Sequence, residues 1–310
     1  MTQDPTHGRW RVEPDDAGIR LDKFVAQCGD VSRRIARTWI SSGRVRIKGQ
    51  VIRILTRPLR AGTWVEILTE SSPAPQQAAQ TGAEPEIIYQ DRALLVLNKP
   101  PQLLSESDRF GSPSLETIVP KMLERAGQNG KVWLVHRLDA VTSGVIVMAR
   151  TPRAVRELNE VFREGKATKT YLALVSGYLR KGRDIDAPLA RLKGTKQGVV
   201  PSGKPAHTHV APLQTNRNVT LVRATPTTGR THQIRVHLAS IELPLLGDRL
   251  YGGPGYTGAD TPEPIPRAML HARRLVIPHP ISGETMTFEA PVPDDFVSLA
   301  QAEDIWPTEV

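Results

Sequence analysis

The stretch that decides the fold runs from residue 133 to residue 150 and reads Trp133-Leu134-Val135-His136-Arg137-Leu138-Asp139-Ala140-Val141-Thr142-Ser143-Gly144-Val145-Ile146-Val147-Met148-Ala149-Arg150. Two apolar runs flank a short polar segment, which predicts a strand, an exposed loop and a second strand. The loop collects the side chains that carry chemistry: His136, Arg137, Asp139, Thr142 and Ser143. Because functional residues gather where the backbone leaves a sheet, we expect this loop to form part of a functional site.

Asp139 is the strongest candidate in this loop. It lies between the apolar Leu138 and Ala140, and a sheltered aspartate needs a positive partner or hydrogen-bond donors to stay ionised. On composition alone, the alternative is a turn aspartate that accepts hydrogen bonds from its own backbone near Thr142. The pattern His-Arg-Leu-Asp-x-x-Thr-Ser-Gly resembles the signature of the RluA family of RNA pseudouridine synthases, in which the catalytic aspartate aligns with Asp139.

Composition narrows the class of protein. The chain has 310 residues, a formal net charge of +9 and one cysteine, Cys28. The charge favours a polyanionic partner, and nucleic acid is the commonest one for such a chain, although a basic surface also serves solubility. A single cysteine excludes an internal disulfide and fits a reducing cytosol. No run approaches the roughly 18 apolar residues of a membrane span, and the N-terminus lacks the pattern of a signal peptide. We therefore expect a cytoplasmic protein that contacts no membrane.

The first third of the chain predicts a small basic domain. Leu21, Phe24 and Val25 have helical spacing, with Asp22 and Lys23 expected to face outward. Ser32 is placed to cap a second helix that ends at Gly43. The apolar stripe of this helix is Ile35, Trp39 and Ile40, and its basic face is Arg33, Arg34 and Arg37. The following strand alternates, so Val45 and Ile47 are buried while Arg44, Arg46 and Lys48 face water.

This arrangement resembles the S-four RNA-binding domain from Gly18 through Ile67. The resemblance implies RNA contacts by Arg33, Arg34, Arg37, Arg44, Arg46 and Lys48. Arginine favours this interpretation because its planar head binds phosphate at two points and stacks on bases. The alternative is a solvated basic face on an accessory domain. We expect the S-four-like domain at residues 16–68 after a frayed start, a flexible linker at residues 69–85 rich in Pro, Ala and Gln, and a catalytic domain at residues 86–296.

The second domain is expected to open with a β-hairpin, Ile87 to Tyr89 and Leu94 to Leu97. The RluA-like family typically reads Asn-Lys-Pro-x-Gly after such a hairpin. Here Asn98-Lys99-Pro100 is followed by Pro101 and Gln102. The missing glycine leaves open which family contacts hold between Gln102 and Gly111. Beyond it, Ser114 is placed to cap a helix that runs to about Arg125.

Two later segments extend the resemblance. A helix is expected to start at Thr151-Pro152, and the next strand, residues 169–175, is similar to the family's Lys-x-Tyr-x-Ala segment, in which Tyr171 aligns with the tyrosine that packs on the target base. Without the family, a core tyrosine is an equal alternative. Residues 229–237 resemble the motif Gly-Arg-Thr-His-Gln-Ile-Arg-Val-His, whose second arginine, here Arg235, pairs with the catalytic aspartate. A surface arginine on a helix is the alternative interpretation.

No cofactor or metal is expected. Gly253, Gly255 and Gly258 match a dinucleotide pattern, but prolines follow where a helix should start, which favours a surface loop. His232 and His237 lie five positions apart, so on a helix they diverge by roughly 140°, and no third metal ligand is evident. Residues 177–206 are interpreted as irregular and basic, with Arg191, Lys193 and Lys196 unassigned.

The resemblance implies an α+β catalytic domain on a mixed, largely antiparallel sheet, preceded by the small domain of helices and short strands. It further implies the isomerisation of uridine to pseudouridine in structured RNA. Asp139 would act as nucleophile or base, Arg235 would keep it ionised and Tyr171 would stack on uracil. Arg137 is expected to contact RNA, by entering the base stack or by binding a phosphate. We expect a monomer that acts on ribosomal RNA of the large subunit. The alternatives are transfer RNA as the substrate, or a non-catalytic RNA-binding factor in ribosome assembly.

Overall fold

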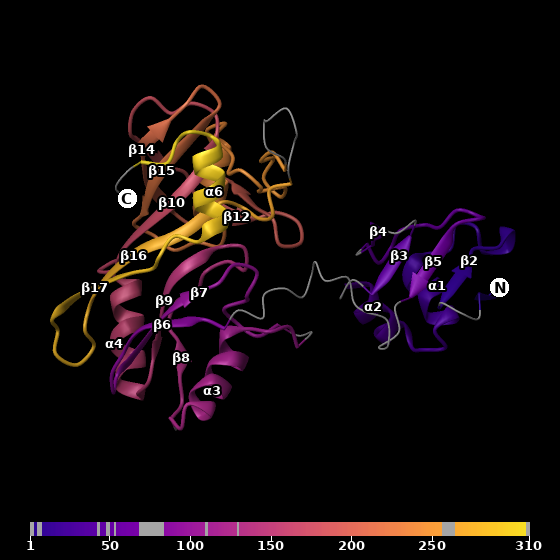
Figure 1. The fold of residues 1–310 in the computed structure, drawn as a ribbon, viewed down its shortest axis with the longest axis horizontal. Coiled ribbons are helices and arrows are strands. Elements are labelled where there is room, and N and C mark those ends of the chain that lie inside the picture. The colour runs from indigo at the N-terminus through magenta and orange to yellow at the C-terminus, as the bar shows by residue number, and fades with distance from the viewer. Residues whose placement is uncertain are drawn as a thin grey trace. The chain divides into compact units, whose positions relative to one another are not determined.

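The computed structural model describes residues 3–4, 8–41, 44–47, 50–52, 54–67, 84–108, 111–128, 130–255 and 264–307. The chain divides into two compact units, Met1–Gly82 and Ala83–Val310 (Figure 1). Each unit has its own hydrophobic core. Gly43, Lys48, Gly258 and most of the expected linker lie outside the described residues, as does the side chain of Arg34.

The first unit packs two helices on a five-stranded sheet. The helices are α1 (Leu21–Cys28) and α2 (Arg33–Ser41), and a single 3-10 turn, η1 (Pro14–Asp16), precedes them. The sheet has the strand order β1-β2-β5-β3-β4. Its strands are β1 (Gln3–Asp4), β2 (Arg9–Arg11), β3 (Val45–Ile47), β4 (Gln50–Val51) and β5 (Trp64–Ile67). Val45 and Ile47 are buried, as the alternation predicts.

Three expectations for this unit are wrong. Residues 9–12 are not frayed, because β2 pairs with β5 and buries Trp10 and Val12. Ile35 is 43% exposed, since the helix instead turns Ala36 and Ile40, one turn apart, toward the core. Asp22 is fully buried rather than turned outward, because three arginine side chains contact its carboxylate.

The second unit is built on a ten-stranded sheet with two strands off the main path. Its central order is β11-β14-β15-β10-β16-β9-β7-β6, with β17 paired to β16 and β8 to β9. Within the described residues, the strands of this sheet pair in antiparallel fashion except for β9 and β16, which are parallel. The strands are β6 (Glu86–Gln90), β7 (Leu94–Lys99), β8 (Trp133–Leu134), β9 (Ser143–Ala149), β10 (Thr168–Ser176), β11 (Arg183–Asp186), β14 (His207–Thr215), β15 (Val219–Pro226), β16 (Leu270–Pro278) and β17 (Thr285–Glu289). The predicted α+β class with a mixed, largely antiparallel sheet is confirmed.

The helices of this unit are α3 (Leu115–Arg125), α4 (Pro152–Arg163), α5 (Gln233–Ser240) and α6 (Asp294–Ala302). Ser114 and Thr151 cap α3 and α4 through their hydroxyl groups, as their positions in the sequence predict. Apolar residues of α3 and α4 share one core cluster with β7 and β9. In Figure 1, these two helices lie at the end of the unit where β7, β8 and β9 are found.

The side chains of strand β10 point alternately to the two faces of the sheet. Leu172 and Leu174 pack with α6, whereas Ala173 and Val175 pack with α5. Because side chains alternate along a strand, Tyr171 falls on the face that α5 covers. The strand periodicity thus places Tyr171 near the residues of α5.

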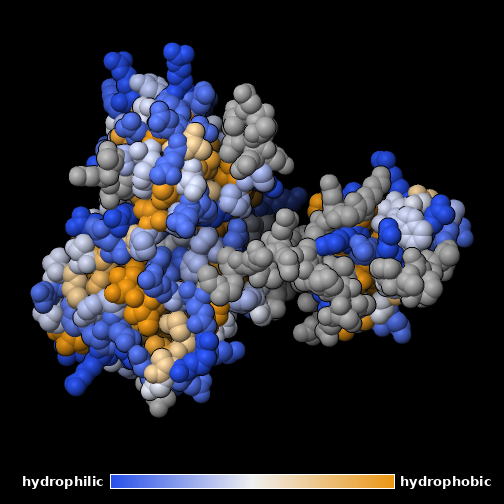
Figure 2. All heavy atoms as spheres, in the orientation of Figure 1, coloured by the Kyte–Doolittle hydropathy of each residue, from blue (hydrophilic) through white to orange (hydrophobic). Residues whose placement is uncertain are grey.

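Residues 177–206 are more regular than expected. They contain β11 and a separate hairpin of β12 (Leu189–Arg191) and β13 (Gln197–Val199). Strands of three residues show no clear alternation, so their pairing depends on neighbours rather than on local pattern. Within the described residues, no helix is long and apolar enough to cross a membrane. Figure 2 shows hydrophilic side chains over much of one face, interrupted by apolar patches.

Candidate active site

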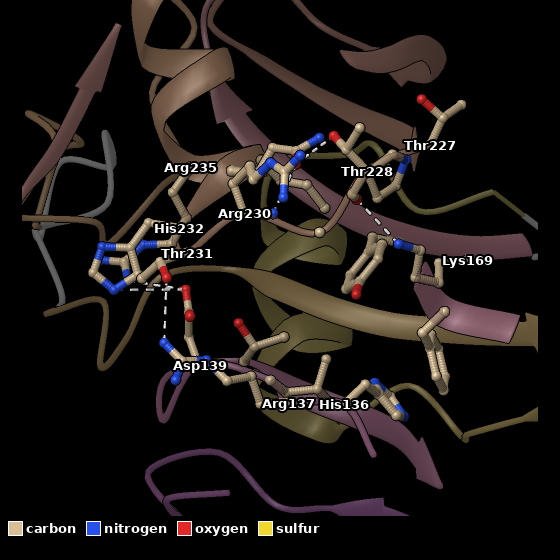
Figure 3. A pocket seen from close by; sticks show the side chains of 18 of the residues that line it. His136, Arg137, Asp139, Lys169, Thr227, Thr228, Arg230, Thr231, His232 and Arg235 are labelled. Atoms are coloured by element: carbon tan, nitrogen blue, oxygen red, sulfur yellow. Dashed lines mark hydrogen bonds and ion pairs between the residues drawn. The ribbon is translucent and has the colours of Figure 1, made fainter. Parts of the chain in front are cut away.

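A cavity of about 710 Å³ opens between the loop before β9, strand β10 and the segment that leads into α5. Asp139, Tyr171 and Arg235, which are far apart in the sequence, all line it. Figure 3 shows Asp139, Thr231 and His232 together at one end of this cavity, and Lys169 and His136 toward the other. The structure therefore brings the three predicted catalytic residues into one site.

Asp139 is held by Arg235. The guanidinium Nη1 of Arg235 donates to Oδ2 of Asp139 at 3.2 Å, and the Asp139 side chain is 20% exposed to the cavity. The same guanidinium donates through Nε and Nη2 to Asp248, at 2.7 and 2.9 Å. Burial disfavours the charge on Arg235, but the hydrogen bonds and negative charge of Asp248, with Asp139 next, outweigh it and raise the pKa of the guanidinium. Arg235 is thus a permanent cation that faces two carboxylates.

His232 is the second neighbour of Asp139. Its Nε2 lies 4.0 Å from Oδ2 of Asp139, and its Nδ1 is 2.7 Å from the hydroxyl of Tyr251. That hydroxyl accepts the backbone N–H of Gln197 at 3.0 Å, so its own hydrogen is directed to Nδ1. Burial lowers the pKa of His232, which favours a neutral ring with its proton on Nε2. This tautomer directs an N–H toward Asp139.

The backbone of His232 is also unusual. It has a φ of 57° at the residue preceding α5, the left-handed region that a residue with a Cβ seldom adopts. Such conformations persist where the surrounding structure over-determines them and are concentrated at functional sites. Here the contacts of the ring with Tyr251 and Asp139 provide that constraint.

Tyr171 lines the cavity from β10. Burial, together with the negative charge of Asp139, raises the pKa of its hydroxyl, so the phenol stays protonated at neutral pH. A neutral ring beside a carboxylate presents an aromatic surface and one O–H group to a ligand. This combination suits a planar base.

The loop that carries Asp139 is held through its backbone. Lys99 is fully buried and donates to the carbonyl groups of Pro100, Leu103 and Ala140, at 2.9, 2.7 and 3.2 Å. Burial, with the charge of Arg267 second, lowers the pKa of Lys99 to about 7. Ser105 also bonds to both the N–H and the carbonyl group of Leu138. The position of Asp139 therefore depends on contacts from a distant segment.

Gln102 occupies the position of the glycine that is missing from the family pattern, and it adopts a backbone conformation typical of glycine. Its φ is 67°, the left-handed region that glycine enters freely, and its N–H donates to the Ala140 carbonyl at 2.7 Å. The exposed glutamine side chain leaves this backbone path open. The segment from Gln102 consequently returns to the Asp139 loop even without a glycine.

At its C-terminal end, the loop that carries Asp139 runs into β9, which approaches β16 closely at Gly144. Gly144 has a φ of 114°, and a Cβ on it would overlap the backbone of Ala272. The parallel pairing of β9 with β16 starts at this point. Any side chain at position 144 would push the two strands apart, so the glycine is required by contact as well as by conformation.

Arg137 lies at the mouth of the cavity, with its side chain 53% exposed. It donates to the hydroxyl of Thr231 at 3.2 Å (Figure 3). It also donates to Glu106 at 2.7 Å. Both partners are near the surface, so the guanidinium is accessible to a ligand. His136, by contrast, is turned inward, stacks on Phe162 and accepts the N–H of Val147, and burial lowers its pKa to about 3.

Arg33 and Arg37, two of the predicted RNA-binding residues of the first unit, form a cluster with Arg20 around Asp22. Arg20, Arg33 and Arg37 contact the buried Asp22 at 3.1, 3.0 and 3.0 Å and keep about half of their side chains exposed. Burial by itself would raise the pKa of Asp22, but the three arginines outweigh it and lower the pKa to about 2. One carboxylate thus orients three cations.

The basic strand of this unit differs in part from expectation. Arg44 lies over the ring of Trp39, 5.2 Å from its centroid. Arg46 is half-buried rather than fully exposed, and its Nε has no hydrogen-bond partner within the described residues. Arg44 and Arg46 are therefore both partly buried, and contacts with Trp39 and Asp22 hold the guanidinium groups of Arg44 and Arg33.

Comparison with known proteins shows the family of the chain. Residues 93–240 match the family model described as RNA pseudouridylate synthase, and residues 19–65 match the S4 domain. The ribosomal large subunit pseudouridine synthase D of Haemophilus influenzae is 38% identical, covering 94% of this chain and 93% of the relative. The chain belongs to the RNA pseudouridylate synthase family. The predicted family and enzyme class of this RNA pseudouridine synthase are confirmed, and its S4 domain is an RNA-binding module.

Other relatives of the RNA pseudouridine synthase agree. The protein of the same name from Pseudomonas aeruginosa is 36% identical and covers 91% of both chains. The solved structure of human RNA pseudouridylate synthase domain containing 1 has a TM-score of 0.54 and 26% identity, covering 72% of this chain and 96% of that one. Human RNA pseudouridylate synthase domain containing 4 shares the fold, with a TM-score of 0.60, 24% identity and coverage of 72% and 94%.

Three residues of the synthase site were missed from the sequence. Asp248 and Tyr251 follow Gly247 in a segment beside the glycine-rich loop, and the sequence singles out Lys99 only as part of the segment Asn98-Lys99-Pro100. In the sequence, a lysine at the end of a strand and an aspartate after a glycine are weak signals. They do not indicate which residues these side chains contact in the folded protein. Within the described residues, no group of three His, Cys, Asp or Glu side chains could hold a metal ion.

Proposed function

We propose that this synthase converts uridine to pseudouridine in ribosomal RNA of the large subunit, with Asp139 as its catalytic residue. The observation that carries the proposal is the contact of Asp139 with Arg235 at the wall of the cavity. The relatives named ribosomal large subunit pseudouridine synthase D support large-subunit ribosomal RNA as the substrate. A monomer in the cytoplasm is the form in which we expect the enzyme to meet that RNA.

The reaction is balanced without a cofactor. The N1–C1′ glycosidic bond breaks, the uracil turns, a C5–C1′ bond forms, and one proton moves from C5 to N1. Asp139 acts as the nucleophile or as the base. Nη1 of Arg235 donates to Oδ2 of Asp139, so Oδ1 is the oxygen offered to the substrate. His232 lies beside the same oxygen, with its Nε2 4.0 Å from Oδ2.

Tyr171 supports the base. Its ring and the carboxylate of Asp139 line one cavity, and its protonated hydroxyl offers a hydrogen-bond donor to the uracil. Stacking on an aromatic ring holds a base that has left its own stack. Arg137, at the cavity mouth, is placed to contact the RNA that this base leaves.

The test is pseudouridine mapping of total RNA by carbodiimide-dependent primer extension. Cells lacking the protein are compared with cells that express wild type, Asp139→Asn, or Asp186→Asn as a control at an exposed aspartate outside the cavity. We expect a large-subunit site to vanish in the deletion and to return with wild type and Asp186→Asn only. Restoration of the site by Asp139→Asn would overturn the catalytic assignment, and a changed site in transfer RNA alone would overturn the substrate.

A further inference from the structure

A second cavity of about 730 Å³ adjoins the active site. It is bounded by the β12–β13 hairpin, by the segment Ser202 to Lys204 and by residues 229–232. Arg137 and residues 229–232 line both cavities, so the two share a wall close to Asp139. The catalytic roles proposed above make no use of this space.

The second cavity is cationic. Its described lining includes four basic side chains and no Asp or Glu, and the four are Arg137, Arg191, Lys204 and Arg230. Thr195, Ser202 and Thr231 add hydroxyl groups. Arginine, lysine and hydroxyl side chains are the groups that contact the phosphate and sugar of nucleic acids. The lining therefore suits a polyanionic chain better than an isolated base.

Hydrogen bonds to backbone carbonyl groups restrain two of these basic side chains, Arg191 and Arg230. Nε of Arg191 donates to the Gly194 carbonyl at 2.6 Å, and Nε of Arg230 donates to the Pro205 carbonyl at 3.0 Å. In each case the terminal nitrogens of the guanidinium are left for a ligand. Such restraint lowers the entropy that a flexible side chain loses on binding.

The hairpin is itself anchored to the catalytic helix. Leu189 packs in a small core with Ala206 and Val236 of α5, and Tyr251 lies against that core. Gln197 of β13 donates to the Tyr251 hydroxyl, which bonds His232 beside Asp139. The wall of the second cavity is thus connected to the catalytic end of the first by direct contacts.

We propose that the second cavity binds the ribose–phosphate backbone of the nucleotides next to the target uridine. The inference rests on the proposed function, because a uracil in the first cavity has its ribose near Asp139 and its backbone must continue from there. The shared wall leads that backbone toward the cationic lining. Arg191 and Lys204 are then phosphate contacts, with no part in the chemical step.

The test compares two double variants of the full-length protein. Arg191→Ala with Lys204→Ala removes two exposed charges from the second cavity. Arg153→Ala with Arg156→Ala is the matched control, because it removes two exposed charges from α4 outside both cavities. The probe is an RNA fragment that contains the uridine found by mapping. Single-turnover rates are measured against enzyme concentration at several salt concentrations.

We expect the cavity variant to raise the half-saturating enzyme concentration about tenfold and to lower the salt slope by about 1 to 1.5, since each lost phosphate contact removes roughly 0.7 for single strands. The rate at saturation stays within about twofold of wild type, and the control variant changes neither quantity by as much. Replacing the phosphates beside the uridine with neutral methylphosphonates weakens binding to wild type and adds little in the cavity variant.

Two outcomes would overturn the proposal. Equal salt slopes for the cavity and control variants would show that no phosphate binds there. Inhibition by free uridine monophosphate that the cavity variant relieves, with RNA binding unchanged, would assign the space to a small nucleotide instead. Failure of wild type to form pseudouridine in any RNA would contradict the proposed function, a result that differs from both.

Discussion

Arg235 and Asp248 form a buried two-point ion pair, with Nε 2.7 Å from Oδ2 and Nη2 2.9 Å from Oδ1. The pair leaves Nη1 of the arginine for Asp139. Without Asp248, the guanidinium would be free to turn toward Asp139 or toward the cavity. We therefore propose that Asp248 is a positioning residue, which determines how the guanidinium of Arg235 meets the carboxylate of Asp139.

We predict that Asp248→Asn lowers the single-turnover rate at saturating RNA at least tenfold, because one partner of a buried charge pair is lost. The half-saturating concentration changes little, since the binding surfaces are intact. Release of tritium from RNA labelled at C5 of uridine measures the rate. Asp184→Asn, at an exposed aspartate beside two histidines, serves as the control. Equal rates for the two variants would contradict the positioning role.

Lys99 provides a test that depends on pH. Its pKa in the folded protein is about 7, well below the ordinary 10.5, so the folded state binds fewer protons than the unfolded chain between these values. The cost of burying the charge is fully present below pH 7, and stability rises with pH above it. Relative to Lys99→Met, wild type should gain roughly 2 kcal/mol in free energy of unfolding between pH 7 and pH 9. Urea denaturation at pH 6, 7, 8 and 9 measures the difference, and parallel curves would refute the shift.

The same variant should also slow catalysis. Methionine fills the space of the lysine but donates no hydrogen bond to the carbonyl groups of Pro100, Leu103 and Ala140. The loop that carries Asp139 then loses part of its support, and we expect the saturating rate to fall about tenfold or more. Hydrogen exchange of residues 138–142 should rise in parallel. A slower rate with unchanged exchange would mean that Lys99 acts in some other way.

Gln102 holds a left-handed conformation that costs a residue with a Cβ about 1 kcal/mol or more. Gln102→Gly removes this cost, although the greater freedom of glycine in the unfolded chain offsets part of the gain. We predict an increase in the free energy of unfolding of about 0.5 kcal/mol. Gln102→Val should lower it by more than 1 kcal/mol, because a β-branched residue tolerates a positive φ poorly. Calorimetry of wild type and the two variants measures these differences in the free energy of unfolding. A Gln102→Val variant more stable than wild type would show that the backbone of residue 102 is not strained.

The lowered pKa of Asp22 predicts that the stability of the first unit falls at acidic pH. Its pKa is lowered to about 2 from 3.8, so its ionised form stabilises the fold above pH 3.8 and this contribution is lost as the pH falls toward 2. Because the three arginines are half-exposed, we expect only about 1 kcal/mol after screening by water. Thermal unfolding of wild type and Asp22→Asn should therefore differ at pH 5 and converge near pH 2. A constant difference would contradict the linkage.

The elements with strong local patterns follow from the sequence. Ser114 and Thr151 mark helix starts because a hydroxyl before an apolar-periodic run satisfies free N–H groups. The apolar runs around β7 and β9 identify the central strands. The motif around Asp139 also indicates the family, which the relatives confirm. Helix caps, apolar runs and short motifs depend on residues that are adjacent in the chain, so they can be predicted from the sequence.

Only the tertiary structure shows that Asp248 pairs with Arg235, that Lys99 supports the Asp139 loop, and that Asp22 is buried beneath three arginines. Each of these charges is stable because of a partner that is remote in the chain or out of phase with the local pattern. Periodicity assigned Asp22 to the surface because a lone carboxylate belongs in water. The physical reason for the difference is that burial of a charge is decided by its partners in space, and local spacing does not specify them.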